Sequence, residues 1–302
     1  MGTPDFAVPS LKALKEAGYE IPLVITQPDK PAGRGKRLKP PPVKVEAERL
    51  GLKVYQPERI KDNEELKKIL EEISPDLIVV AAYGKILPDW LLKLPKYGVI
   101  NVHASLLPKY RGASPIQAAL LNGERKTGIT IMKVIPELDA GDVISQREVE
   151  IKKEDNAQTL HDRLAQVGAE LLTETIPKFT KGEIEPKPQN HDKATYCPKI
   201  TKEMGRINWE RSAEEIFNMV RAFTPWPGAF TYYKGKMVKL TKVKPAEGKG
   251  EPGEVIEAGK RLIVATGKGA LEILRIKPEG RKEISGDEFI RGYRVRAGDR
   301  FG

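Results

Sequence analysis

Residues 77–103, LIVVAAYGKILPDWLLKLPKYGVINVH, contain two short apolar runs on either side of an amphipathic stretch. The runs at 77–82 and 99–103 consist mostly of apolar residues, which is typical of buried strands in a parallel sheet. Residues 87–94 between them have helical spacing. The order strand, helix, strand therefore predicts a mostly parallel, Rossmann-like α/β sheet that is covered by helices on both faces.

This alternation extends to both sides of the stretch. Helical spacing recurs in the segments 8–17, 66–73, 114–121 and 160–179. Residues 21–26 predict another buried strand, and residues 128–134 and 143–151 alternate like an antiparallel pair. A sheet of this kind normally opens with a strand, yet nothing apolar precedes the turn-like Gly2-Thr3-Pro4. Either the fold begins unusually, or its first strand is missing from this version of the chain.

The pattern changes after a proline-rich segment. Residues 183–199, EIEPKPQNHDKATYCPK, have three prolines and no apolar periodicity, so we expect a linker there. One helix over 212–223 is followed by short β-prone runs that are mostly separated by glycine-containing turns, which predicts a small antiparallel OB-like barrel. We therefore expect an α/β domain at 1–182, a linker at 183–200 and a basic β-barrel at 201–302.

Charge is distributed unevenly along the chain. The 302 residues carry a formal net charge of +10, and residues 201–302 alone hold 21 basic and 14 acidic side chains. A basic module attached to a nearly neutral body favours a polyanionic partner, above all RNA or DNA. The alternative is a lysine-rich surface that only keeps the protein in solution.

Several classes of protein are excluded by composition. No stretch approaches the ~20 apolar residues that cross a bilayer, and no charged-then-apolar signal peptide opens the sequence. One cysteine gives no disulfide framework, and one cysteine with three histidines argues against structural zinc. We therefore expect a metal-free protein of the cytoplasm with no membrane segment.

Asn101 and His103 lie at the carboxyl end of a predicted buried strand, where ligands bind in open α/β sheets. Alternation places both side chains on one side of the strand, with Val102 on the other. A lone histidine there is often only a satisfied core residue. A neighbouring amide makes the functional interpretation stronger, because Asn donates hydrogen bonds and an imidazole exchanges protons near neutral pH.

Two loops complete this candidate site. Residues 105–112, SLLPKYRG, form a loop next to the histidine, which is either a plain turn or the wall of a pocket. Asp139-Ala140-Gly141-Asp142 falls between the two antiparallel strands. Such a sequence most often forms only a turn. The functional alternative is that the carboxylate approaches His103 and holds its tautomer.

A basic loop covers residues 27–45, QPDKPAGRGKRLKPPPVKV, with six basic side chains and Asp29 as its only acid. Five prolines exclude a helix or a central strand. Gly33-x-Gly35 is no dinucleotide fingerprint, because the third glycine and the following helix are missing. The loop suits phosphate contacts to a nucleic-acid backbone; a disordered solvated loop is the alternative.

Together these motifs resemble the folate-dependent formyltransferase family, and within it the methionyl-tRNA formyltransferases. The resemblance covers nearly the whole chain in the right order, through residues 2–6, QPDKPAGRGKRL at 27–38, INVHASLLPKYRGASPIQ at 100–117, LDAGD at 138–142 and NWERSAEEIFNMVRAFTPWPGAF at 208–230. The family has a hydrophobic strand before Gly2-Thr3-Pro4, so the beginning of this chain departs from its pattern.

The resemblance implies an enzyme of translation initiation. It would transfer the formyl group of 10-formyltetrahydrofolate, as co-substrate, to the α-amine of methionyl initiator tRNA, without a metal. The family's catalytic residues match Asn101, His103 and Asp139. Its folate-contacting loop matches Ser105, Leu106, Leu107 and Pro108, and its tRNA-contacting loop matches the segment with Arg34, Lys36 and Arg37. We expect a monomer.

On this interpretation Asn101 and a protonated His103 stabilise the negative charge that develops on the formyl oxygen. Asp139 keeps His103 charged and helps to pass the amine's proton to the departing folate nitrogen. Two alternatives remain: another folate-dependent formyltransferase with a small amine substrate, and an RNA-binding protein with an inert α/β domain. The basic loop and barrel argue against the first, and the Asn-x-His strand end with LDAGD argues against the second.

Overall fold

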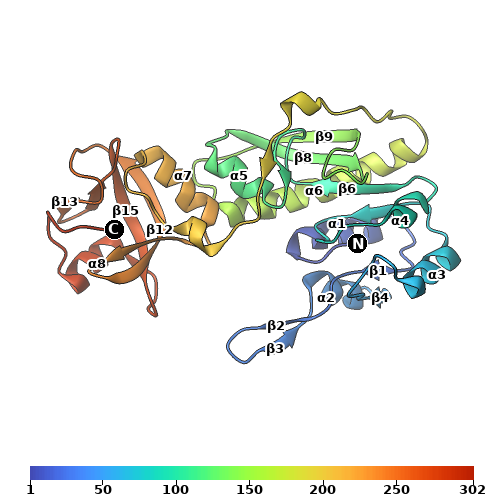
Figure 1. Ribbon diagram of the computed structural model, residues 1–302, viewed down its shortest axis with the longest axis horizontal. Coiled ribbons are helices and arrows are strands. Elements are labelled where there is room, and N and C mark those ends of the chain that lie inside the picture. The colour runs from blue at the N-terminus through green and yellow to red at the C-terminus, as the bar shows by residue number, and fades with distance from the viewer. The chain divides into compact units, whose positions relative to one another are not determined.

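In the computed structural model, which describes residues 1–302, β6 (Val99–His103) lies inside a four-stranded sheet ordered β5–β6–β8–β9 (Figure 1). β5 (Ile78–Val80) runs parallel to β6, whereas β8 (Lys126–Lys133) is antiparallel to both β6 and β9 (Val143–Glu150). The α/β class is confirmed. This sheet is mixed rather than mostly parallel, because an apolar run marks a buried strand without fixing its direction.

A second pair of strands, β1 (Val24–Ile25) and β4 (Val54–Tyr55), is parallel. Only Met1 and Gly2 lie between this pair and β5: the Gly2 amide donates to Ile25, and the Met1 carbonyl accepts from the Ala81 amide. A largely apolar cavity of about 740 Å³ borders these residues. Met1 and Gly2 thus connect the β1–β4 pair with the end of β5 through backbone hydrogen bonds.

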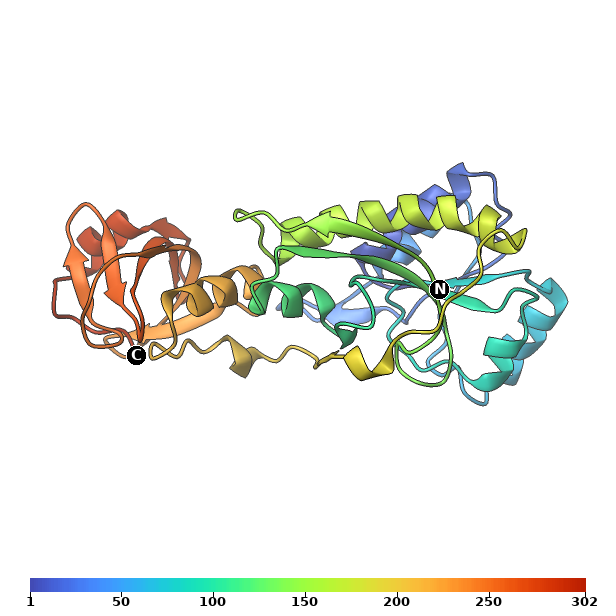
Figure 2. The same cartoon turned by 90° about the horizontal axis from the view of Figure 1, so that it is seen from above.

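Helices flank these strands. They comprise η1 (Asp5–Ala7), α1 (Val8–Glu16), α2 (Pro42–Arg49), α3 (Glu64–Ile73), α4 (Asp89–Lys93) and α6 (Ala157–Thr180). Figure 2 shows α6 alongside β8 and β9. Gly168 allows this close packing, because a Cβ there would approach the side chains of Val102 and Ile129. The helix thereby fixes the strand that carries His103.

The basic loop forms an antiparallel hairpin of β2 (Lys30–Ala32) and β3 (Arg37–Lys39), both fully exposed (Figure 1). Gly33 and Lys36 have positive φ in the connecting turn. The prolines do exclude a central strand, but they permit this exposed two-stranded ribbon. Its base is fixed by Asp29, which accepts hydrogen bonds from Lys44 and Gln56. These bonds hold the pKa of Asp29 below its usual value.

The expected linker is more ordered than its composition predicts. It contains η2 (His191–Lys193) and β10 (Tyr196–Cys197), and β10 pairs in parallel with β7 (Arg111–Gly112). Gln189 and Cys197 are buried. This segment is ordered by contacts with residues far away in the sequence, so its local sequence pattern does not predict its structure.

The chain divides into two units, each assembled from three stretches of sequence. The first comprises Met1–Gly112, Lys126–Glu150 and His161–Cys197, and the second comprises Ala113–Arg125, Ile151–Leu160 and Pro198–Gly302. In the second unit α5 (Pro115–Leu121) packs against α7 (Ala213–Phe223). The domain boundaries expected at 182 and 200 stay a prediction.

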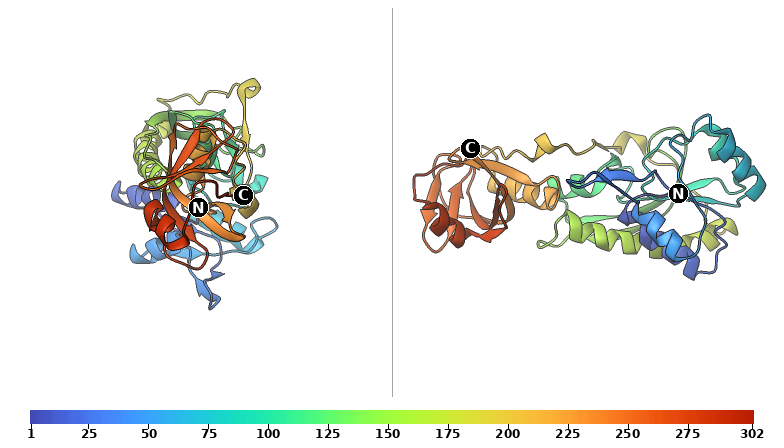
Figure 3. Two further views of the ribbon diagram at one scale, coloured as in Figure 1. Left: turned by 90° about the vertical axis from the view of Figure 1, so that its left-hand side faces the viewer. Right: turned by 90° about the horizontal axis from the view of Figure 1, so that it is seen from below.

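The second unit contains a six-stranded antiparallel sheet. Its strands are β11 (Ala229–Tyr233), β12 (Lys236–Ala246), β13 (Val255–Ala258), β14 (Leu262–Ala265), β15 (Ala270–Pro278) and β16 (Ile284–Ser285), and η3 (Lys202–Gly205) and α8 (Gly286–Tyr293) complete the unit. Figure 3 shows these strands in orange and red. The core of this unit includes Trp209, Leu240, Val264 and Phe289.

The order of these strands is β11–β12–β15–β14–β13, with β16 paired to β15, and the outermost strands β11 and β13 do not pair. Isolated bridges join Phe301 to Tyr233 and Arg300 to Glu254. An antiparallel sheet is therefore confirmed, and a closed OB-like barrel is not. No helix in the structure is both long and apolar enough to span a bilayer.

Candidate active site

The carboxyl end of β6 brings Asn101 and His103 to one side of the strand, as the alternation predicts. Asn101 is half-buried, and its side-chain amide has no hydrogen-bond partner within the protein. His103 is only 6% exposed. The amide of Asn101 is therefore free to donate to a ligand.

His103 has a fixed orientation. Its Nε2 lies 2.9 Å from the backbone carbonyl oxygen of Tyr110, seven residues further along the chain. A carbonyl oxygen only accepts, so Nε2 carries a hydrogen and donates it. This leaves Nδ1 as the ring nitrogen that the loop does not engage.

Asp139 faces that nitrogen. Its Oδ2 lies 3.8 Å from Nδ1 of His103, which is too long for a direct hydrogen bond. A third atom placed beside the pair, about 2.8 Å from each, would satisfy both groups. The same Oδ2 accepts a hydrogen bond of 2.8 Å from the backbone amide of Gly112. The carboxylate is thereby held in one orientation toward the imidazole.

The loop containing Ser105, Leu106, Leu107 and Pro108 follows the histidine and is tied to the sheet. Thr130 on β8 donates to the Ser105 carbonyl at 2.7 Å and accepts from the Leu107 amide at 3.1 Å. Gln146 on β9 donates to both Thr130 and the Leu107 carbonyl. Leu106 lies against Gly128, where a Cβ would collide with its side chain. The loop is thus a rigid wall beside His103.

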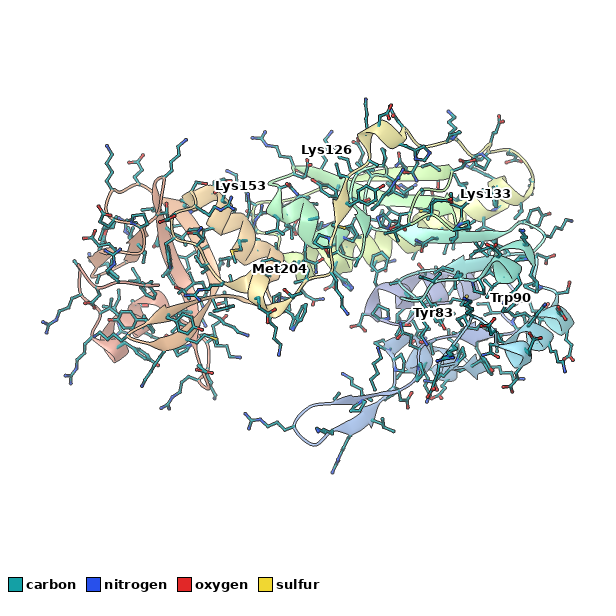
Figure 4. All side chains as sticks on the ribbon, viewed as in Figure 1. Tyr83, Trp90, Lys126, Lys133, Lys153 and Met204 are labelled. Carbon is teal, nitrogen blue, oxygen red and sulfur yellow. The ribbon has the colours of Figure 1, made fainter.

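The neighbouring strand ends at the same edge of the sheet, because Val80 pairs with Asn101. Tyr83 follows this strand, is 2% exposed, and has a hydroxyl with no partner in the protein. Burial raises the pKa of Tyr83 to about 12. Its carbonyl oxygen accepts from Thr3 and Gln27 (Figure 4 labels Tyr83), so this segment is fixed to the beginning of the basic hairpin.

Arg34, Lys36 and Arg37 lie on the hairpin and are all exposed. None of the hairpin's cations forms an ion pair, whereas Lys44 at its base is paired with Asp29. No hydrogen bond or ion pair joins the hairpin to His103 or Asp139. The structure therefore brings the three candidate catalytic residues and the loop at 105–108 together and keeps the basic ribbon separate.

Sequence reasoning missed several residues that support the site. Tyr110, Gly112 and Thr130 hold His103, Asp139 and the loop at 105–108 in place through a backbone carbonyl, a backbone amide and a hydroxyl. In the sequence the glycine at 112 indicates only a turn, and the threonine only a residue of a strand. Their contacts span 7 to 27 residues, a range that local periodicity does not encode.

Comparisons with known proteins agree with this architecture. A family described as "Formyl transferase" matches residues 1–176, and one described as "Formyl transferase, C-terminal domain" matches residues 199–294. The methionyl-tRNA formyltransferase of Caldanaerobacter subterraneus subsp. tengcongensis is 51% identical over 300 residues, covering 99% of this chain and 97% of that protein. The Bacillus subtilis protein of the same name is 50% identical, covering 100% and 96%.

Solved structures show the same fold. An N-formyltransferase from Helicobacter canadensis, in complex with folinic acid and dTDP-3-aminofucose, superposes with a TM-score of 0.66. It is 21% identical, and the match covers 90% of this chain and 96% of that one. The architecture is therefore that of an N-terminal formyltransferase domain followed by a C-terminal sheet domain.

Proposed function

The chain belongs to the methionyl-tRNA formyltransferase family, and from this premise we propose that Asn101, His103 and Asp139 form its catalytic site. The enzyme transfers a formyl group from 10-formyltetrahydrofolate to the α-amine of methionyl initiator tRNA. The observation that carries the site proposal is the 3.8 Å approach of a buried imidazole to a carboxylate beside an unpartnered amide.

The residues fit a formyl donor held at the edge of the sheet. The folate co-substrate supplies the formyl group, and the wall formed by Ser105, Leu106, Leu107 and Pro108 is proposed to contact it. Asn101 donates a hydrogen bond to the formyl oxygen, where negative charge develops as the amine attacks. No partner within the protein competes for this amide, so it is available for that bond.

His103 and Asp139 are proposed to manage the proton. Because Nε2–H is held by Tyr110, the proton moves at Nδ1, on the side of the carboxylate. An attacking amine or a water placed beside both groups can pass its proton to this pair and onward to the departing folate nitrogen. The contact of Nε2 with the Tyr110 carbonyl and the approach of Asp139 to Nδ1 support Nδ1 as the ring nitrogen that takes part in the reaction.

The tRNA is proposed to be held by charge. Arg34, Lys36 and Arg37 present free cations on an exposed ribbon, and the C-terminal unit carries most of the chain's excess positive charge. Cations of this kind contact phosphates and displace counterions. We further propose that the C-terminal sheet curls into an OB-like barrel that lies along the tRNA, and that the enzyme is a monomer of the cytoplasm.

A formyl-transfer assay tests the proposal. The acceptors are methionyl initiator tRNA, methionyl elongator tRNA and methionine methyl ester as a small amine, each with 10-formyltetrahydrofolate. We expect efficient transfer to the initiator only, and loss of that transfer in His103→Ala. Equal transfer to the small amine would overturn the role of the basic surfaces, and an unchanged His103→Ala rate would overturn the catalytic site.

A further inference from the structure

We infer that Gln189, in the proline-rich segment, is a positioning residue that holds the Asp139 loop in its reactive geometry. This inference rests on the proposed catalytic site and extends it to a segment whose composition predicts only a linker. The decisive juxtaposition is one buried side-chain amide that bonds two carbonyl groups of the loop and one guanidinium at the same time.

Both side-chain N–H groups of Gln189 donate to the Asp139 loop. Its Nε2 donates to the backbone carbonyl oxygens of Asp139 and Gly141, at 2.8 Å each. The side chain is 7% exposed, so water does not compete effectively for these bonds. Two bonds to carbonyls two residues apart fix the direction of the peptide that carries the carboxylate.

The loop needs such a restraint. Asp139 has φ of +49°, in the left-handed region that non-glycine residues seldom occupy. Gly141 lies so close to the Lys133 carbonyl that a Cβ would overlap it, which fixes the other end of the turn (Figure 4 labels Lys133). Between these two points only Gln189 holds the Asp139 carbonyl, because no other group donates to it.

The side-chain oxygen of Gln189 accepts hydrogen bonds from Arg111. Its Oε1 accepts from Nη2 at 2.8 Å and from Nε at 3.2 Å of that arginine. Arg111 is 3% exposed and has no carboxylate partner; its other contacts are His191 and Tyr196. A buried guanidinium stays charged, so it needs acceptors, and Gln189 is the best placed of them.

Arg111 belongs to the loop that orients the other catalytic groups. The neighbouring Tyr110 carbonyl binds His103, and the neighbouring Gly112 amide binds Asp139. Gln189 therefore joins the backbone on both sides of the imidazole–carboxylate pair. Loss of its donors would let the carboxylate rotate while leaving the folate wall at 105–108 anchored to Thr130 and Gln146.

The test compares Gln189→Glu with Gln189→Met in the full-length enzyme. Glu keeps an acceptor for Arg111 and removes the two donors, whereas Met removes donors and acceptor without adding charge. We expect each to lower kcat by about 100-fold, because misplacing a catalytic group by ~1 Å has effects of that size. We expect the KM for 10-formyltetrahydrofolate to stay within about twofold of wild type, since its proposed wall is untouched.

Asn190→Ala is the matched control, because this exposed neighbour only accepts a hydrogen bond from Asp192. It should keep wild-type kcat. A kcat near wild type in either folded Gln189 variant overturns the inference. Failure of both variants to fold overturns it too, because Gln189 would then serve stability rather than positioning. His103→Ala separates the two proposals: if it is inactive while the Gln189 variants are active, only this inference fails.

Discussion

The backbone amide of Gly112 donates a hydrogen bond of 2.8 Å to the carboxylate of Asp139, 27 residues further along the chain. The nearby Tyr110 carbonyl accepts from His103. One short loop therefore orients both members of the imidazole–carboxylate pair, and variants can separate its effects on chemistry from those on folding.

Replacing His103 with alanine removes the proposed proton-transfer group. We expect kcat to fall by a factor of about 10²–10³ or more, in the range seen when a general acid–base or an oxyanion donor is removed. Folate affinity, measured by equilibrium titration, should remain within about twofold. The control is His161→Ala, a histidine that contacts Phe6 and Asp162 away from the site. An equal fall in kcat in both variants would contradict the assignment.

Asp139→Asn isolates the role of charge. The amide oxygen of asparagine still accepts from the Gly112 amide, so the loop should keep its conformation. We expect kcat to fall roughly 100-fold, because a neutral amide does not stabilise a protonated imidazole. Thermal melting should match wild type. A fully active Asp139→Asn enzyme would show that the carboxylate has no part in the reaction.

Neutralising the ribbon tests phosphate binding. In the triple variant Arg34→Ala, Lys36→Ala and Arg37→Ala, we expect a higher KM for charged tRNA and an unchanged KM for folate. The salt dependence of tRNA affinity should also become shallower, by about 0.7–0.9 in slope for each phosphate that the ribbon no longer neutralises. Arg59→Ala removes an equally exposed cation elsewhere and serves as the control. An unaltered salt slope in the triple variant would argue against binding of the phosphate backbone by the ribbon.

Tyr83→Phe removes a buried hydroxyl that has no partner. We expect the free energy of unfolding at pH 7 to stay equal or rise by about 1 kcal/mol, because an unsatisfied buried polar group is costly. The pKa of Tyr83 is raised to about 12, so above about pH 10 the unfolded chain releases this proton while the folded protein keeps it.

Stability should therefore fall with rising pH between about 10 and 12, by up to about 1.4 kcal/mol per pH unit from this residue. Chemical denaturation of wild type and Tyr83→Phe over this range measures the contribution. Parallel pH curves for the two proteins would show that the hydroxyl titrates normally in the folded state.

Gly112→Ala adds a Cβ that overlaps the Cys197 carbonyl, at a residue with φ of +116°. We expect it to lower the free energy of unfolding by more than about 2 kcal/mol and to reduce kcat, because β7 and β10 must separate. Gly98→Ala has a similarly positive φ of +76° but open space around it, so only the backbone cost of about 1 kcal/mol applies. Equal destabilisation in the two variants would show that the overlap is relieved.

The local pattern of apolar residues is enough to predict helices and strands whose buried side chains recur at a regular spacing. The run at 99–103 forms β6, and the helical spacing over 160–179 lies within α6. Alternation also places Asn101 and His103 together. The residue types at 138–142 indicate a turn, and the resemblance rather than the spacing singles out Asp139.

Features that depend on distant partners are not predictable in this way. The order of residues 189–197 arises from Arg111 and the Asp139 loop, which lie 50 or more residues away. The prolines at 31 and 40–42 predict irregular structure because proline weakens strands, yet the turn residues of the hairpin accept positive φ and let the ribbon form.

The second unit gathers its helix α5 from residues 113–125, far upstream of its sheet. A gene fragment that begins at codon 201 would therefore encode α7 without the helix that it packs against, leaving an apolar surface uncovered. The two family matches cover residues 1–176 and 199–294, so α5 falls in the first match and the sheet in the second. Insertions, fusions or circular permutations planned from these two ranges would separate α5 from the unit to which it belongs. Engineering of the second unit has to proceed by substitution within the intact polypeptide.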